Sequence, residues 1–124
     1  MKNKRGFTLS ELLIVVAIIA VLVAIAIPVF NAQLHKSRVA VDWANTRAYF
    51  AELQLDFLEN GYDTAKENEI GKPGLTELTV GNQTLHLEEG SLWVQPEDNH
   101  KKGYNILYRC DKGHLECQLI LPTD

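Results

Sequence analysis

The stretch Gly6-Phe7-Thr8-Leu9-Ser10-Glu11 leads directly into an apolar run without a charged side chain, Leu12–Phe30. At ~1.5 Å rise per residue in a helix, this run covers roughly 28 Å, close to the hydrocarbon thickness of a bilayer. Residues 2–5 place three cations just before it. An ionisable group at the edge of such a segment costs on the order of 3 kcal/mol or more, so Glu11 is a candidate functional residue.

This order of a short basic leader, Gly, Phe, Thr, Leu, any residue and Glu resembles the N-terminus of type IV pilins and pseudopilins. The resemblance covers the first half of the chain. It implies that a prepilin peptidase cuts between Gly6 and Phe7, and that Phe7 becomes the methylated N-terminal residue. Thr8 and Leu9 then belong to the assembly segment, and Pro28 stands where the family commonly places a helix-interrupting proline.

The carboxylate of Glu11 is expected to meet a positive charge, because an isolated carboxylate in hydrocarbon either protonates or finds a cation. The resemblance implies that this cation is the N-terminal ammonium of Phe7 in a neighbouring subunit. At ~4 Å such a pair attracts by roughly 4 kcal/mol at an effective dielectric of about 20. The alternative is that Glu11 reaches back to the membrane interface as a border residue.

Two other interpretations of the N-terminus remain open. In a secretory signal peptide, Leu12–Val23 would be the apolar core, Ala24-Ile25-Ala26 the cleavage site and Ile27 the first mature residue. An uncleaved anchor would keep the whole segment. The motif ending in Glu11 favours the pilin interpretation over both.

The distribution of charge along the chain predicts the orientation and disfavours one class of partner. The formal charge is −4, and removal of the leader leaves nine basic against sixteen acidic residues, a charge of −7. Such a chain is not expected to bind nucleic acid, which requires a basic face. The leader cations Lys2, Lys4 and Arg5 stay on the cytoplasmic side, so the C-terminal body is predicted to lie outside the cytoplasmic membrane and later in an extracellular pilus.

Residues 7–60 are predicted to form one long helix, with a kink or local melting near Pro28 because proline removes a backbone hydrogen bond. We divide the chain into a leader (1–6), a hydrophobic transmembrane and assembly helix (7–30), an amphipathic outer helix (31–60) and a connector with a β-sheet head (61–124). Three groups of side chains are expected around the outer helix: an aliphatic stripe, an adjacent aromatic face, and a charged surface that includes Asp42. The stripe consists of Leu34, Val41, Ala44, Ala48, Ala51, Leu55 and Leu58, and the aromatic face of Trp43, Phe50 and Phe57.

The second half, residues 61–124, is predicted to begin with a surface connector up to Gly74 and to continue with short strands. Expected strands are 76–80 and 83–87 around a Gly81-Asn82 turn, then 91–95, and a terminal hairpin of 104–110 and 115–121. The predicted fold class is α+β: a long N-terminal helix packed on a small antiparallel sheet of about four strands.

Cys110 and Cys117 are predicted to form a disulfide in an exported body. A turn on Gly113-His114 would place them directly opposite each other, within disulfide range, whereas a turn on Lys112-Gly113 would oppose Cys110 to Leu115. The four histidines show no spacing typical of a catalytic or metal site, so we expect no metal and no cofactor.

The sequence therefore predicts a structural subunit of a type IV pilus-like filament and not an enzyme. By resemblance, its partners are copies of itself, other pilins, a prepilin peptidase, a platform protein and an assembly ATPase. The alternatives are a pseudopilin of a type II secretion or competence system, and a membrane-anchored extracellular binding module.

Overall fold

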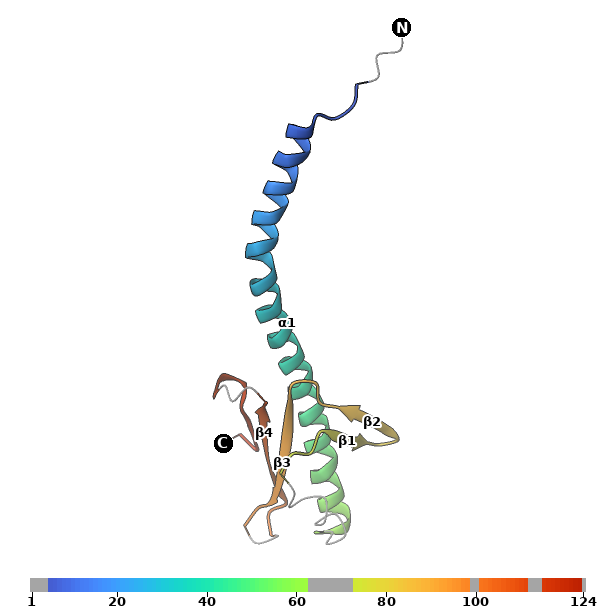
Figure 1. Ribbon diagram of the computed structural model, residues 1–124. Helices are drawn as coiled ribbons and strands as arrows, with labels where there is room; N and C mark the ends of the chain where they lie inside the picture. The colour runs from blue at the N-terminus through green and yellow to red at the C-terminus, as the bar shows by residue number, and fades with distance from the viewer. Residues whose placement is uncertain (1–4, 63–72, 99–100, 112–114, 124) are drawn as a thin grey trace. The chain divides into compact units, whose positions relative to one another are not determined.

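A computed structural model describes residues 5–62, 73–98, 101–111 and 115–123. Over these residues the chain forms one long helix, α1 (Leu9–Asn60), two small antiparallel sheets and a short 3-10 segment (Figure 1). It divides into two compact units, one ending at His35 and the other beginning at Lys36. The α+β class is confirmed, and each unit is described by itself.

The first unit is the apolar part of α1. Its side chains from Leu12 to Phe30 are all exposed in the single chain. This part of the helix is long and apolar enough to cross a membrane by length and composition. The helix runs unbroken through Pro28, so the expected local melting is wrong. Proline deletes one hydrogen bond, and the turns on either side hold the helical path.

In the second unit, α1 buries one side against the sheets. Its fully buried residues are Val39, Asp42, Thr46, Tyr49 and Leu53. The predicted aromatic face packs beside them, with Trp43, Phe50 and Phe57 partly buried against the core. Asp42 was assigned to the charged surface, and this was wrong, because its carboxylate has hydrogen-bond partners in the head.

The first sheet is the hairpin of β1 (Glu77–Val80) and β2 (Gln83–His86), as predicted. Val80 pairs with Gln83, so the connection is the two-residue turn Gly81-Asn82. Gly81 has φ 60°, the left-handed region that such a tight turn requires at its first position. Glycine adopts it without steric cost.

The second sheet has the strand order β3-β4-β5, with β3 (Gly90–Pro96), β4 (Tyr104–Cys110) and β5 (Leu119–Leu121) all antiparallel. The prediction of a single sheet is therefore wrong, although a bridge from Leu75 to Leu92 connects the two parts of the head. After β2, the N–H groups of Glu88 and Glu89 bond to Asp42 of the helix instead of to another strand. This contact turns the chain away from β1 before β3 begins.

The core of the head lies between α1 and the inward faces of the strands. Residues alternate along β3 and β4, because successive side chains of a strand point to opposite faces. The fully or almost fully buried side chains of the second sheet are Leu92, Val94, Tyr104, Ile106, Tyr108, Cys110, Leu119 and Leu121.

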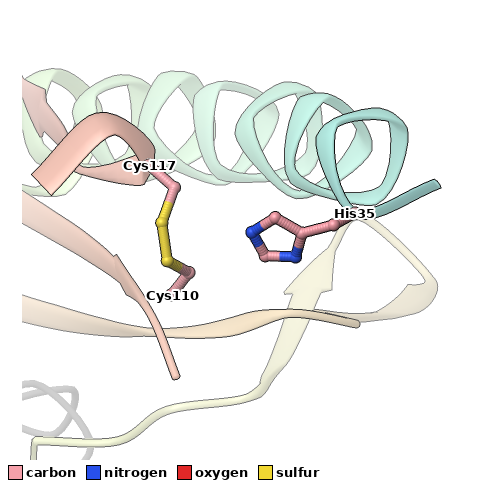
Figure 2. Close-up of side chains that lie close together, drawn as sticks. All are labelled: His35, Cys110 and Cys117. Carbon is pink, nitrogen blue, oxygen red and sulfur yellow. A yellow bond between two sulfur atoms is a disulfide. The ribbon is translucent and has the colours of Figure 1, made fainter. Parts of the chain in front are cut away.

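The predicted disulfide between Cys110 and Cys117 is present, and its Cα atoms are 5.9 Å apart (Figure 2). Pairing of Tyr108 with Leu119 establishes the register in which residues 110 and 117 are opposite, and excludes the register that would oppose Cys110 to Leu115. The expected continuous strand from 115 to 121 is wrong. Cys117 instead ends a 3-10 segment, η2 (Leu115–Cys117), and β5 begins only at Leu119.

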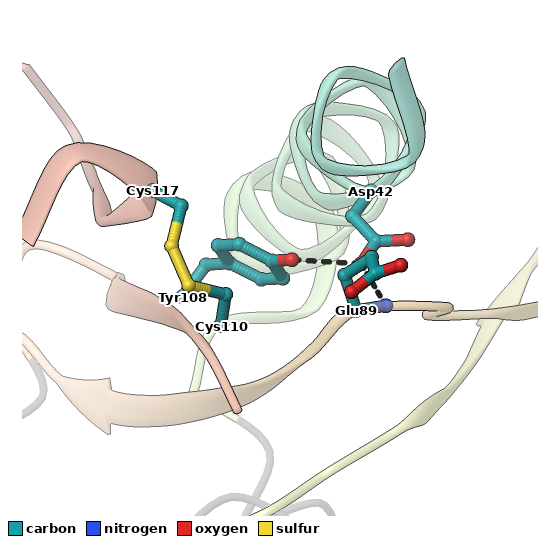
Figure 3. The surroundings of a disulfide bond; sticks show 5 residues. All are labelled: Asp42, Glu89, Tyr108, Cys110 and Cys117. Atoms are coloured by element: carbon teal, nitrogen blue, oxygen red, sulfur yellow. Dashed lines mark hydrogen bonds between the residues drawn. A yellow bond between two sulfur atoms is a disulfide. The ribbon is translucent and has the colours of Figure 1, made fainter. Parts of the chain in front are cut away.

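The buried carboxylate of Asp42 joins the helix to β4 and to the segment between the two sheets (Figure 3). Its Oδ1 accepts a hydrogen bond from Glu88 N–H at 2.8 Å, and its Oδ2 accepts from Glu89 N–H at 2.9 Å and from the Tyr108 hydroxyl at 2.7 Å. A buried carboxylate is tolerated when donors satisfy it in this way.

Two predicted features, most of the connector 61–74 and the tip of the last hairpin, lie outside the described residues.

Candidate assembly site

The N-terminus of α1 forms a reciprocal capping box. Thr8 is the residue before the helix, and its Oγ1 accepts a hydrogen bond from the Glu11 N–H at 3.3 Å. In return, Glu11 Oε2 accepts one from the Thr8 N–H at 3.2 Å. Threonine followed three residues later by glutamate is the sequence signature of this arrangement, which satisfies two backbone donors that the helix leaves unpaired. Both residues belong to the predicted assembly motif, but their local role as a cap is not among the predictions.

The capping box places the carboxylate of Glu11 in the first turn of the helix. There the partial positive charge of the helix N-terminus favours an anion. Glu11 uses one oxygen for the cap, and in the described part of the chain its Oε1 has no hydrogen-bond partner. A carboxylate can accept several hydrogen bonds, so Glu11 is able to bind a further donor without losing the cap.

The predicted cleavage residues precede the helix. Gly6 and Phe7 have no regular secondary structure, and Phe7 is 86% exposed. A side-chain carbon added at Gly6 would meet no atom within 4 Å, so the chain is open at this point. Leu9 begins the helix and Pro28 lies inside it, so the predicted assembly residues belong to α1 and, in the case of Thr8, to its N-terminal cap.

A second apolar surface lies on the outer half of α1, and we name it the outer stripe. It consists of Val41, Ala44, Ala48, Ala51, Leu55 and Leu58, all exposed. At 100° per residue these positions fall on the side of the helix opposite to the buried residues. Their alternating spacing of three and four residues repeats every seven residues, the pattern with which one helix packs against another.

Polar side chains on the flanks of the outer stripe bond to the head. Arg38 Nη1 lies 3.3 Å from Glu89 Oε1, and the Gly81 N–H donates to the Glu52 carboxylate at 2.8 and 3.0 Å. Gln54 Nε2 donates to the backbone oxygen of Tyr104 at 3.4 Å. These contacts orient the helix so that its aromatic side faces the core and the outer stripe faces away from it.

Comparison with known proteins decides the family. The prokaryotic N-terminal methylation motif matches residues 1–27. The type IV wide pilus major component PilA4 of Thermus thermophilus is 44% identical over 94 residues, which cover 73% of this chain and 69% of the relative. The chain belongs to the type IV pilin family. The predicted resemblance is therefore confirmed.

Two further relatives match over a smaller share of their own length. The type IV major pilin PilA of Myxococcus xanthus is 43% identical over 69 residues, 56% of this pilin and 31% of the relative. Prepilin peptidase-dependent protein D of Escherichia coli is 38% identical over 77 residues, 61% of this pilin and 53% of the relative. This pilin thus spans about a third to a half of the length of these two relatives. No solved structure matches it significantly.

Membership in the family bears on activity and location. This pilin belongs to a family of structural proteins. Its long apolar helix and the methylation motif fit a subunit that is first anchored in a membrane and later part of an extracellular pilus.

Proposed function

We propose that this pilin is a filament subunit, exported with its head outside the cytoplasmic membrane, cleaved after Gly6 and packed through α1 into a pilus-like fibre. The observation that carries the proposal is the outer stripe. A monomeric protein gains nothing from a continuous apolar surface on the solvent side of a helix. Burying this surface against neighbouring subunits contributes a favourable free energy of about 25 cal/mol for each Å² of apolar surface removed from water.

The composition of the outer stripe suits helix packing. Its central positions are Ala44, Ala48 and Ala51, and its ends carry Val41 and the two leucines. Small residues let helix backbones approach closely, while the larger ends fill the space around them. The exposed apolar run of residues 12–30 belongs to the same helix and would lose its lipid contacts when the subunit leaves the membrane.

Processing and packing are chemically linked in this proposal. Cleavage after Gly6 creates an ammonium at Phe7, and methylation leaves its charge in place. The capping box holds Glu11 in the first turn of the helix, where its carboxylate can accept from the ammonium of a neighbouring subunit. The pair would set the register between subunits. The pathway requires a prepilin peptidase, a platform protein, an assembly ATPase and other pilins.

A pair of matched substitutions on the exposed surface of α1 tests the proposal. Ala48 lies in the outer stripe, whereas Lys36 is exposed on the same helix about 90° away from the centre of the stripe. Ala48→Glu and Lys36→Glu both place a carboxylate on the surface of α1 at a small cost in helix propensity. In cells that assemble fibres from this pilin, we expect Ala48→Glu to stay in the membrane fraction and Lys36→Glu to appear in sheared fibres. Normal fibres of Ala48→Glu would contradict the proposal.

A further inference from the structure

The outward face of the second sheet carries an apolar row that crosses all three strands. Trp93 of β3 pairs with Leu107 of β4, and Leu107 pairs with Ile120 of β5. Their neighbours along each strand point into the core, so these three side chains point away from it. Trp93 is 38% exposed and Ile120 57% exposed.

A hollow of about 440 Å³ lies along this row. Besides the three apolar side chains, its lining includes the amides of Gln95, Asn105 and Gln118. Glu97 contributes a carboxylate to the lining, and among the described residues no lysine or arginine lines the hollow. An amide side chain both donates and accepts hydrogen bonds, so the site offers donors and acceptors around an aromatic ring without a positive charge.

We propose that this hollow binds a neutral saccharide. A pyranose ring has an apolar face of C–H bonds that stacks on an indole, and hydroxyls at its edge that both donate and accept. Trp93 supplies the indole, and Gln95, Asn105 and Gln118 surround it with matching amides. The nearby carboxylate of Glu97 accepts from sugar hydroxyls and disfavours anionic ligands.

The size of the site favours a small ligand over a protein. Ligand pockets usually enclose about 300–1,000 Å³, and the hollow falls in this range. A stable protein interface needs about 800 Å² on each partner, with a continuous apolar centre. One row of three apolar residues is much smaller, and a protein surface laid over it would bury the flanking amides without the adaptable hydroxyls that satisfy them.

The test uses the full-length pilin in a zwitterionic detergent, because detergents with glucoside or maltoside headgroups would occupy the site. The probes are cellobiose, lactose and N,N′-diacetylchitobiose at millimolar concentration, and the readout is saturation-transfer NMR of the sugar protons. We expect transfer from at least one of them to the wild type. Trp93→Ala should abolish it, and Gln95→Ala should weaken binding about fivefold, the effect of one hydrogen bond.

Gln83→Ala is the matched control, because Gln83 is an exposed glutamine on β2 of the other sheet. It should leave transfer unchanged. Denaturant unfolding of each variant shows that the head is folded, and Gln95→Ala tests the site even if Trp93→Ala destabilises it. Transfer from none of the sugars, or transfer that persists in both site variants, overturns the proposal. Dimerisation that requires Trp93, without sugar binding, overturns it in favour of a second copy.

Discussion

The Tyr108 hydroxyl donates a 2.7 Å hydrogen bond to Oδ2 of Asp42, and both side chains are completely buried. This contact joins the central strand of the second sheet to the helix across 66 positions of the sequence. The same carboxylate accepts the N–H groups of Glu88 and Glu89 between the two sheets. One side chain of α1 therefore binds both β4 and the segment that connects the two sheets.

We predict that Asp42→Ala destabilises the head by about 3 kcal/mol or more, because it leaves two backbone donors and a buried hydroxyl without their charged acceptor. The measurement is the free energy of unfolding in urea at neutral pH. Glu59→Ala is the control, since Glu59 is exposed on the same helix, and its effect should stay within about 0.5 kcal/mol. Equal free energies of unfolding for the two variants would show that the Asp42 contacts do not stabilise the head.

Alkaline pH should weaken the head through Tyr108. Burial and the hydrogen bond to Asp42 raise the pKa of its hydroxyl well above the ordinary value. In the unfolded chain Tyr108 loses its proton from about pH 10 upward, while the folded protein retains it. The contribution to stability is thus fully present below pH ~10 and decreases as the pH rises beyond it.

The measurement is the pH dependence of the unfolding free energy of the wild type and of Tyr108→Phe. At neutral pH we expect the variant to be less stable by about 1.5–3 kcal/mol, the range for a hydrogen bond to a charged group. Above pH 10 this difference should narrow, because only the wild type loses the Tyr108 contribution. A difference that stays constant from pH 7 to about 11 would contradict the pKa shift.

The capping by Glu11 and its proposed charge pairing can be separated. Glu11→Gln keeps an acceptor for the Thr8 N–H, because glutamine also serves in a capping box, but it removes the charge. Glu11→Ala removes both. We expect both variants to be cleaved and membrane-bound yet absent from sheared fibres, as judged by intact mass and by immunoblot of each fraction. Assembly of Glu11→Gln with failure of Glu11→Ala would show that the cap matters and the charge does not.

The disulfide between Cys110 and Cys117 closes a short loop, so it should contribute about 2–3 kcal/mol in the loop-closure account. Reduction of this disulfide in the wild type should therefore lower the urea concentration at the unfolding midpoint. The double variant Cys110→Ala/Cys117→Ala is the control and should unfold at the same midpoint with and without reductant. A wild-type midpoint that is insensitive to complete reduction would contradict this contribution.

The local elements were predictable because short-range chemistry determines them. The apolar run, the turn at Gly81 and the strand alternation each depend on neighbours in the sequence, and all three are found. The motif from Gly6 to Glu11 also identified the family. The capping box was visible in principle, since its two residues and their spacing are a known signature.

The sequence by itself thus determined the long apolar helix, the hairpins and the family, because periodicity and turn chemistry act over a few residues. Only the tertiary structure decided that Asp42 is buried, that the head has two sheets, and that the outer stripe faces away from the core. The sequence of the outer helix has two apolar sides, the aromatic face and the outer stripe, and it does not show which of them packs on a sheet. The choice here depends on contacts between distant residues, such as Asp42 with Tyr108 and Glu52 with Gly81, which no local pattern encodes.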